Sequence, residues 1–71
     1  MELGNHIRRC RFNRNELTQQ GLAKAIGVSR QTIHSIETGK FVPSTVLALK
    51  IARFFQQQVE DIFYLTEEES A

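Results

Sequence analysis

The chain has 71 residues, 41% of them hydrophobic, which allows one small domain and excludes two. No apolar run approaches the roughly 18 residues that could cross a bilayer, and no secretory signal pattern is present, so we expect a cytoplasmic protein without a membrane partner. The single cysteine, Cys10, excludes an internal disulfide, and a small core without disulfides makes a second subunit an attractive source of stability.

Charge is segregated along the chain. All nine Lys and Arg residues lie between Arg8 and Arg53, where only Glu16 and Glu37 oppose them, and the residues after Arg53 include only acidic charges. A basic body suits a polyanionic partner such as nucleic acid, although surface Lys and Arg often serve only solubility.

A first helix is expected from Leu3 to about Arg14, because Leu3, Ile7 and Cys10 recur at helical spacing. Two short helices separated by a tight turn follow. Thr18 is the expected N-cap of one and Gly27 its end, and Ser29 is the expected N-cap of the next. The apolar positions of this pair are Leu22, Ala23, Ile26, Ile33 and Ile36.

Two further helices complete the expected domain, residues 1–66. Ser44, after Pro43, is the expected N-cap of the longer one. Its apolar positions are Leu47, Ala48, Ile51, Phe54 and, less clearly, Phe55, and those of the last helix are Val59, Ile62 and Phe63. Residues 67–71 read as an acidic tail.

A helix, a glycine-containing turn and a second helix are the ingredients of the helix-turn-helix, in which the second helix enters the major groove of DNA. At about 100° per residue, the outward side of this second helix is polar and carries one charge, Arg30. Arg suits guanine and Gln suits adenine in the major groove, so we expect base contacts from this side. The candidates are Arg30, Gln31, Thr32, His34 and Ser35.

Several stretches resemble the phage repressor and Cro family, also called the XRE family. They include Leu17-Thr18-Gln19-Gln20, Ile26-Gly27-Val28-Ser29-Arg30-Gln31-Thr32-Ile33, Gly39-Lys40, Pro43-Ser44 and Glu60-Asp61-Ile62-Phe63. The resemblance runs from about Asn5 to Phe63. It implies an all-α, compact, lambda-repressor-like domain of five helices, with a short C-terminal strand as an option. It also implies a regulator of transcription, most often a repressor, that binds a double-stranded DNA operator as a homodimer and has no cofactor.

The resemblance also implies roles for individual residues. Gln19 would contact a phosphate, and Lys40 with the backbone near Phe41 would hold the flanking strand. An ion pair between Arg11 and Glu37 would join the first helix to the recognition helix. The full set of expected phosphate contacts is Thr18, Gln19, Ser29, Thr38, Lys40 and Phe41.

Several positions depart from the family pattern, including His34 and Ser35, and two others bear on helix stability. Gly21 stands where the family often has an acidic residue, which removes the capping box after Thr18 and is expected to weaken that helix by about 1 kcal/mol. Gln56 replaces a common glycine, so either the preceding helix runs on or Gln56 adopts a left-handed conformation at a cost of about 1 kcal/mol.

An apolar run near the end of the chain suggests a symmetric dimer contact that includes an extended segment from Tyr64 to Thr66. The candidates are Phe54, Phe55, Val59, Ile62, Phe63, Tyr64 and Leu65. The alternative is that the run closes the core of a single chain.

Other functional classes fit the sequence less well. His6 and Cys10 lie four residues apart, but further metal ligands are scarce, and no catalytic constellation, cofactor motif or small-molecule site is evident. Outward aromatic residues for stacking on unpaired RNA bases are missing. The principal alternative to DNA binding is a helix-turn-helix scaffold that serves as a protein-binding module, such as an antitoxin or accessory regulator.

Overall fold

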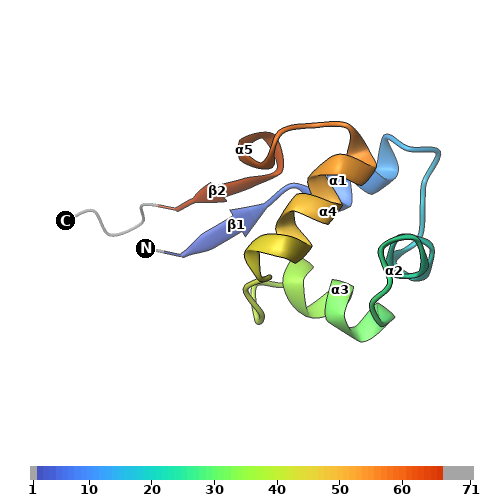
Figure 1. The fold of residues 1–71 in the computed structure, drawn as a ribbon, viewed down its shortest axis with the longest axis horizontal. Helices are drawn as coiled ribbons and strands as arrows, with labels where there is room; N and C mark the ends of the chain where they lie inside the picture. The colour runs from blue at the N-terminus through green and yellow to red at the C-terminus, as the bar shows by residue number, and fades with distance from the viewer. Residues whose placement is uncertain (1, 67–71) are drawn as a thin grey trace.

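A computed structural model describes residues 2–66; Met1 and the expected acidic tail lie outside the described part. Five helices and two short strands make up the described chain (Figure 1). In chain order they are β1 Leu3–Asn5, α1 Ile7–Phe12, α2 Gln19–Ile26, α3 Arg30–Glu37, α4 Thr45–Phe55, α5 Val59–Ile62 and β2 Phe63–Leu65. The predicted five-helix fold is therefore confirmed, and the C-terminal strand that the sequence left open is present as β2.

Hydroxyl side chains begin three of the helices, as predicted. The Oγ1 of Thr18 accepts a hydrogen bond from the Gly21 N–H at 2.9 Å. The Oγ atoms of Ser29 and Ser44 accept from the third residue beyond each of them, both at 3.1 Å. Each bond satisfies an N–H that has no partner within its own helix, and so fixes where that helix starts.

The N-terminal segment differs from its prediction, because Leu3 belongs to strand β1 and the first helix begins only at Ile7. The N-cap is His6, and the Oδ1 of Asn5, one residue before it, accepts the N–H of Ile7 at 3.1 Å. Glycine is a poor helix former, and a side chain at Gly4 would collide with the ring of Tyr64. The helix also ends early, at Phe12, and left-handed Asn15 and Glu16 follow it.

Strands β1 and β2, from opposite ends of the described chain, pair antiparallel as a two-stranded ladder beside the helices (Figure 1). Leu3 lies opposite Leu65 and Gly4 lies opposite Tyr64. The ladder continues past the strands, where the Thr66 N–H donates to the Glu2 carbonyl at 2.8 Å. The two ends of the described chain are therefore bound to each other.

One apolar core occupies the space between the helices. Its buried members are Ile7, Cys10, Leu22, Ala23, Ile26, Ile33, Ile36, Ile51, Ala52, Phe55, Ile62 and Phe63. Of the residues expected on the apolar face of α4, Leu47, Ala48 and Phe54 are only partly buried, and Ala52 takes a core position instead. Within residues 2–66, every helix is too short or too polar to cross a bilayer.

Cys10 packs in this core rather than in a site. Burial raises the pKa of its thiol above the ordinary value, and the positive charge of Arg9 acts in the opposite direction. A thiol with a raised pKa is a weak nucleophile and a poor metal ligand at neutral pH. In the described part of the chain, His, Cys, Asp and Glu side chains form no cluster suited to a metal ion.

Gln56 ends α4 in the left-handed conformation, with φ 59° and ψ 43°, so the second of its two expected outcomes is the observed one. We predict that Gln56→Gly raises the free energy of unfolding by about 0.5–1 kcal/mol, since relief of the left-handed strain exceeds the entropy that glycine adds to the unfolded chain. Urea unfolding measures this. Gln57→Gly is the control, because Gln57 does not have a positive φ and its substitution should give no gain.

Candidate nucleic-acid interface

Helices α2 and α3 meet at the tight turn that the glycine pattern predicts. Gly27 is left-handed, with φ 82°, and its N–H donates to the Ala23 carbonyl at 2.9 Å. Val28 donates to the same carbonyl at 3.0 Å, and Ser29 then caps α3. The second helix therefore starts directly after the first and takes a fixed direction from it.

The two sides of α3 differ sharply in burial. Ile33 and Ile36 are 0% and 2% exposed and anchor the helix to the core. Arg30, Gln31 and His34 are exposed, whereas the expected base-contacting residues Thr32 and Ser35 are only half-buried and present less of their side chains. The outward face is thus rich in hydrogen-bonding groups and is held by a rigid apolar inner face.

The residues expected to contact phosphates differ in whether their hydrogen-bond donors are free or already bonded within the chain. Thr18 uses its oxygen to accept from Gly21, so its hydroxyl hydrogen remains available. The hydroxyl of Thr38 donates to the His34 carbonyl at 3.0 Å, and the Phe41 N–H donates to the Ser35 carbonyl at 3.2 Å. Those two donors are engaged within the chain, so their phosphate contacts stay a prediction that requires an exchange or sharing of these bonds. Lys40 is exposed next to them.

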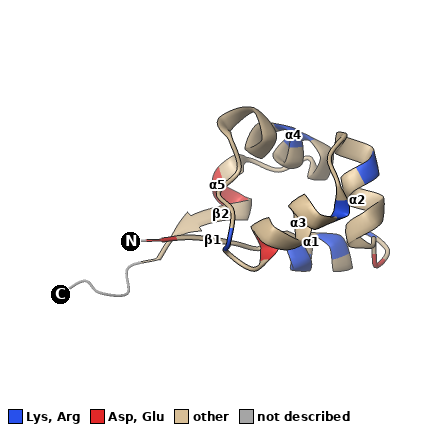
Figure 2. Ribbon diagram, turned by 90° about the horizontal axis from the view of Figure 1, so that it is seen from below, with Lys and Arg blue, Asp and Glu red and all other residues tan. Residues whose placement is uncertain are grey.

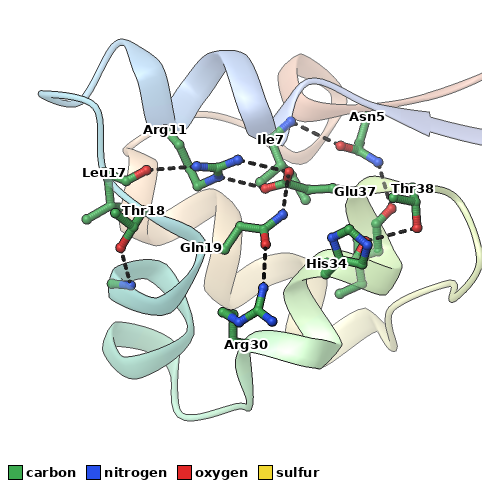
Figure 3. Close-up of polar contacts among 12 residues, drawn as sticks. Asn5, Ile7, Arg11, Leu17, Thr18, Gln19, Arg30, His34, Glu37 and Thr38 are labelled. Atoms are coloured by element: carbon green, nitrogen blue, oxygen red, sulfur yellow. Dashed lines mark hydrogen bonds and ion pairs between the residues drawn. The ribbon is translucent and has the colours of Figure 1, made fainter.

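Arg11 and Glu37 form an ion pair between α1 and the last residue of α3 (Figure 3). The Nε of Arg11 donates to Glu37 Oε2 at 2.7 Å, and Nη2 donates to Oε1 at 3.0 Å. The side chains are 14% and 8% exposed, so little solvent screens the pair. Arg11 also donates to the Leu17 carbonyl at 2.9 Å and thereby braces the approach to α2.

Gln19, on α2, connects this ion pair to Arg30 at the start of the recognition helix. Its Nε2 donates to Glu37 Oε1 at 3.1 Å, and its Oε1 accepts from Arg30 Nη1 at 3.3 Å (Figure 3). The sequence suggested Gln19 only as a phosphate ligand. These bonds join residues 11 to 26 positions apart in sequence, so local spacing carries no signal for them.

Asn5 is a further positioning residue that sequence reasoning missed. Its Nδ2 donates to the Ile36 carbonyl at 3.0 Å while its Oδ1 accepts the Ile7 N–H at the start of α1 (Figure 3). One side chain therefore ties the start of α1 to the end of α3. Asn is favoured at the start of helices, and this preference could have indicated a helix start near Asn5. The helix expected from Leu3 placed Asn5 inside it, so the preference was not used.

Positive charge is not confined to the recognition helix. In Figure 2, Lys and Arg lie on α1, α2 and α4 as well, and acidic residues lie on α5 and also at the end of α3, at Glu37. The outward hydrogen-bonding groups of α3, rather than a concentration of positive charge, distinguish the candidate DNA-binding face.

The structure divides the candidate dimer residues into two groups. Phe55, Ile62 and Phe63 are 8%, 0% and 7% exposed in the core of the single chain. Burial within one chain leaves little surface on these three side chains for the intermolecular contact that the sequence predicts, which stays a prediction. Phe54 and Val59 are half-buried, and the Arg14 guanidinium lies 4.4 Å from the Phe54 ring centroid. Tyr64 and Leu65 are exposed.

Comparison with known proteins gives one consistent result. A helix-turn-helix family model matches residues 7–62. An uncharacterised helix-turn-helix type transcriptional regulator of Methanocaldococcus jannaschii is 56% identical over 55 residues, covering 78% of this chain and 83% of that protein.

Two other uncharacterised regulators of the same type are similar. One from Archaeoglobus fulgidus is 52% identical over 61 residues, covering 86% of this chain and 82% of its own length. YgzD of Bacillus subtilis is 47% identical over 60 residues, covering 84% of this chain and 86% of its own length. With the family match spanning α1 to α5, the chain belongs to the XRE family of helix-turn-helix transcriptional regulators, which are DNA-binding proteins and not enzymes.

Proposed function

We propose that this regulator binds a palindromic operator as a homodimer, reads it through α3 in the major groove, and represses transcription. The observation that carries the proposal is the division of α3 into a buried apolar side and an exposed side with Arg30, Gln31 and His34. Arg pairs with guanine O6 and N7, and Gln with adenine N6 and N7, so this side has the groups that direct readout needs. Occupying a promoter is sufficient for repression.

Phosphate contacts would orient α3 in the groove. We assign them to the free hydroxyl of Thr18, to the second amide hydrogen of Gln19, and to Lys40 at the far end of α3. Ser29 is a weaker candidate because its hydroxyl also lies 2.9 Å from the Thr32 hydroxyl and can use its hydrogen there. The α2 N-terminus adds unpaired N–H groups and a favourable dipole for an anion.

Selection of binding sites from random duplex DNA tests the proposal most directly. We expect a palindrome whose half-sites lie about 34 Å apart, one turn of B-DNA, because two recognition helices of a symmetric dimer would enter successive major grooves. Recovery of a single unpaired half-site would contradict the dimeric arrangement. Recovery of no sequence above background would contradict specific readout.

Gln31→Ala and Lys40→Ala separate readout from phosphate binding. Gln31→Ala should cost about 1–3 kcal/mol on the operator and relax the preference at one base pair. Lys40→Ala should weaken binding to operator and to random DNA alike, and should make the affinity depend less steeply on salt concentration. Fluorescence anisotropy titrations on both DNAs at several salt concentrations measure the difference. Identical behaviour of the two variants would refute this division, and salt-independent binding would favour a protein-binding module.

The surface we assign to the dimer combines the free part of β2 with α4. Tyr64, Leu65, Val46 and Leu49 are exposed, and Leu49 lines the same surface hollow as Val59. Val46 and Leu49 line that hollow together, and exposed apolar neighbours of this kind are typical of a protein contact. This assignment replaces the core residues among the earlier candidates with exposed ones from α4.

We predict that Leu49→Glu converts the dimer to a monomer, because an unpaired carboxylate would be buried at the contact. Sedimentation velocity at micromolar concentration distinguishes the dimer from the 8.2 kDa monomer. Phe12→Glu is the matched control, since Phe12 is a similarly exposed apolar residue that lies on α1. A wild-type chain that sediments only as the monomer would contradict the proposal.

A further inference from the structure

A continuous set of hydrogen bonds leads from α1 to the exposed start of α3 (Figure 3). It passes from Arg11 to the Glu37 carboxylate, from Glu37 to the Gln19 amide, and from Gln19 to the Arg30 guanidinium. The ion-pair end is nearly buried, at 14% and 8% exposure, whereas Arg30 is exposed. The set therefore joins a rigid interior group to a side chain on the candidate DNA-binding face.

The direction of the Gln19 amide is decided by the two groups beside it. A glutamine amide has one end that accepts and one that donates, and the two ends have nearly the same shape. A carboxylate only accepts and a guanidinium only donates. Glu37 therefore selects the NH₂ end of Gln19, which leaves the carbonyl oxygen facing Arg30.

Glu37 is itself held in place by two bonds. Arg11 donates to both carboxylate oxygens, at 2.7 and 3.0 Å, and a planar guanidinium in this arrangement fixes the plane of the carboxylate. A carboxylate fixed on both oxygens cannot turn away from Gln19 without breaking a charge-assisted bond. The orientation of the amide thus originates in the interior of the domain.

We propose that Glu37, acting through Gln19, is a positioning residue that holds the Arg30 guanidinium ready for base readout. This inference rests on the proposed function, because it assigns a cause to the contribution that Arg30 makes there. Ordering a long, flexible side chain on binding costs affinity, and a side chain ordered in advance avoids part of that cost. The relay from Glu37 through Gln19 supplies this order before DNA arrives.

Gln19→Leu is the main test, because it keeps a side chain of similar size and removes both bonds. We expect discrimination at the base pair read by Arg30 to fall by about 2- to 10-fold, the equivalent of ordering one such side chain. Arg30→Ala identifies that base pair. In an Arg30→Ala background, Gln19→Leu should cause no further loss there. Gln20→Leu is the control, since Gln20 is the exposed neighbour on the same helix.

Glu37→Gln tests the origin of the relay, at a temperature where circular dichroism shows the variant folded. It should lower discrimination at the same base pair, whereas a purely structural role would lower the melting temperature and leave base preference unchanged. If Gln19→Leu weakened binding to all DNA sequences equally, Gln19 would only contact phosphate. Either of these alternative results would overturn the proposal.

Nitrogen-15 relaxation of the arginine Nε–H groups in the free protein gives a readout independent of DNA. We expect the order parameter of Arg30 to fall in both Gln19→Leu and Glu37→Gln, and that of Arg11 to fall only in Glu37→Gln. An unchanged Arg30 order parameter would overturn the relay. If the wild-type chain showed no sequence preference, the proposed function would fail while the relaxation result still decided whether the relay exists.

Discussion

Arg11→Ala should lower the free energy of unfolding by about 3–5 kcal/mol, because it leaves the Glu37 carboxylate nearly buried without its cation. Domains of this length have a total stability of only about 4–10 kcal/mol, so the variant should lose a large share of its stability. Urea unfolding followed by circular dichroism measures the change. A loss below about 1 kcal/mol would show that the pair behaves like an exposed one.

Two controls separate the buried charge from the rest of Arg11. Arg8→Ala removes an exposed arginine of the same helix and should change stability by less than about 0.5 kcal/mol. The double variant Arg11→Met with Glu37→Leu replaces both charges by apolar groups and should recover most of the lost stability, since no ion remains buried. If the double variant were as unstable as Arg11→Ala, the unpaired carboxylate would not be the cause.

Ile33→Ala should lower the free energy of unfolding by about 2–5 kcal/mol through the cavity left under the recognition helix, where Ile33 is fully buried. DNA binding should fall only in proportion to the folded fraction, because the outward groups of α3 are unchanged. Thermal unfolding and anisotropy titration on the same samples measure the two effects.

Gln31→Ala is the matched comparison for Ile33→Ala, since it alters an exposed position two residues away on the same helix. It should reduce operator binding with a stability change within about 0.5 kcal/mol. If Ile33→Ala altered base preference while fully folded, the two sides of α3 would not be as separate in function as they are in burial.

The helix boundaries in the centre of the chain could be predicted because they depend on single residues. Thr18, Ser29 and Ser44 each cap a helix with their own hydroxyl, and Gly27 ends one by its left-handed conformation. These effects act over three or four residues, so the local sequence contains them. The buried side of α3 followed from helical period for the same reason.

The N-terminal strand could not be predicted, since its partner lies at the other end of the chain. The apolar spacing of Leu3, Ile7 and Cys10 matches a helix equally well. Pairing with Leu65 and the bond that Asn5 accepts from Ile7 outweigh that periodicity. A local sequence pattern contains no information about a contact between residues that are brought together only by folding.

The candidate site was predicted in part for a related reason. Which side of α3 faces outward depends on the helix itself, but which donors remain free depends on bonds made across the fold. The hydroxyl of Thr38 and the N–H of Phe41 are engaged with carbonyls of α3, and Gln19 is engaged with both Glu37 and Arg30. Residue type shows what a group is able to bind, whereas the assembled structure shows what it has already bound.

The pairing of Glu2 with Thr66 makes the two ends of the described chain a single structural unit. Their bonds join positions 64 residues apart, so fraying of one end removes the partner of the other. Deletions at the start and at the end should therefore cause overlapping rather than additive damage. A linker that joined Thr66 to Glu2 would close residues 2–66 into a ring without displacing a helix.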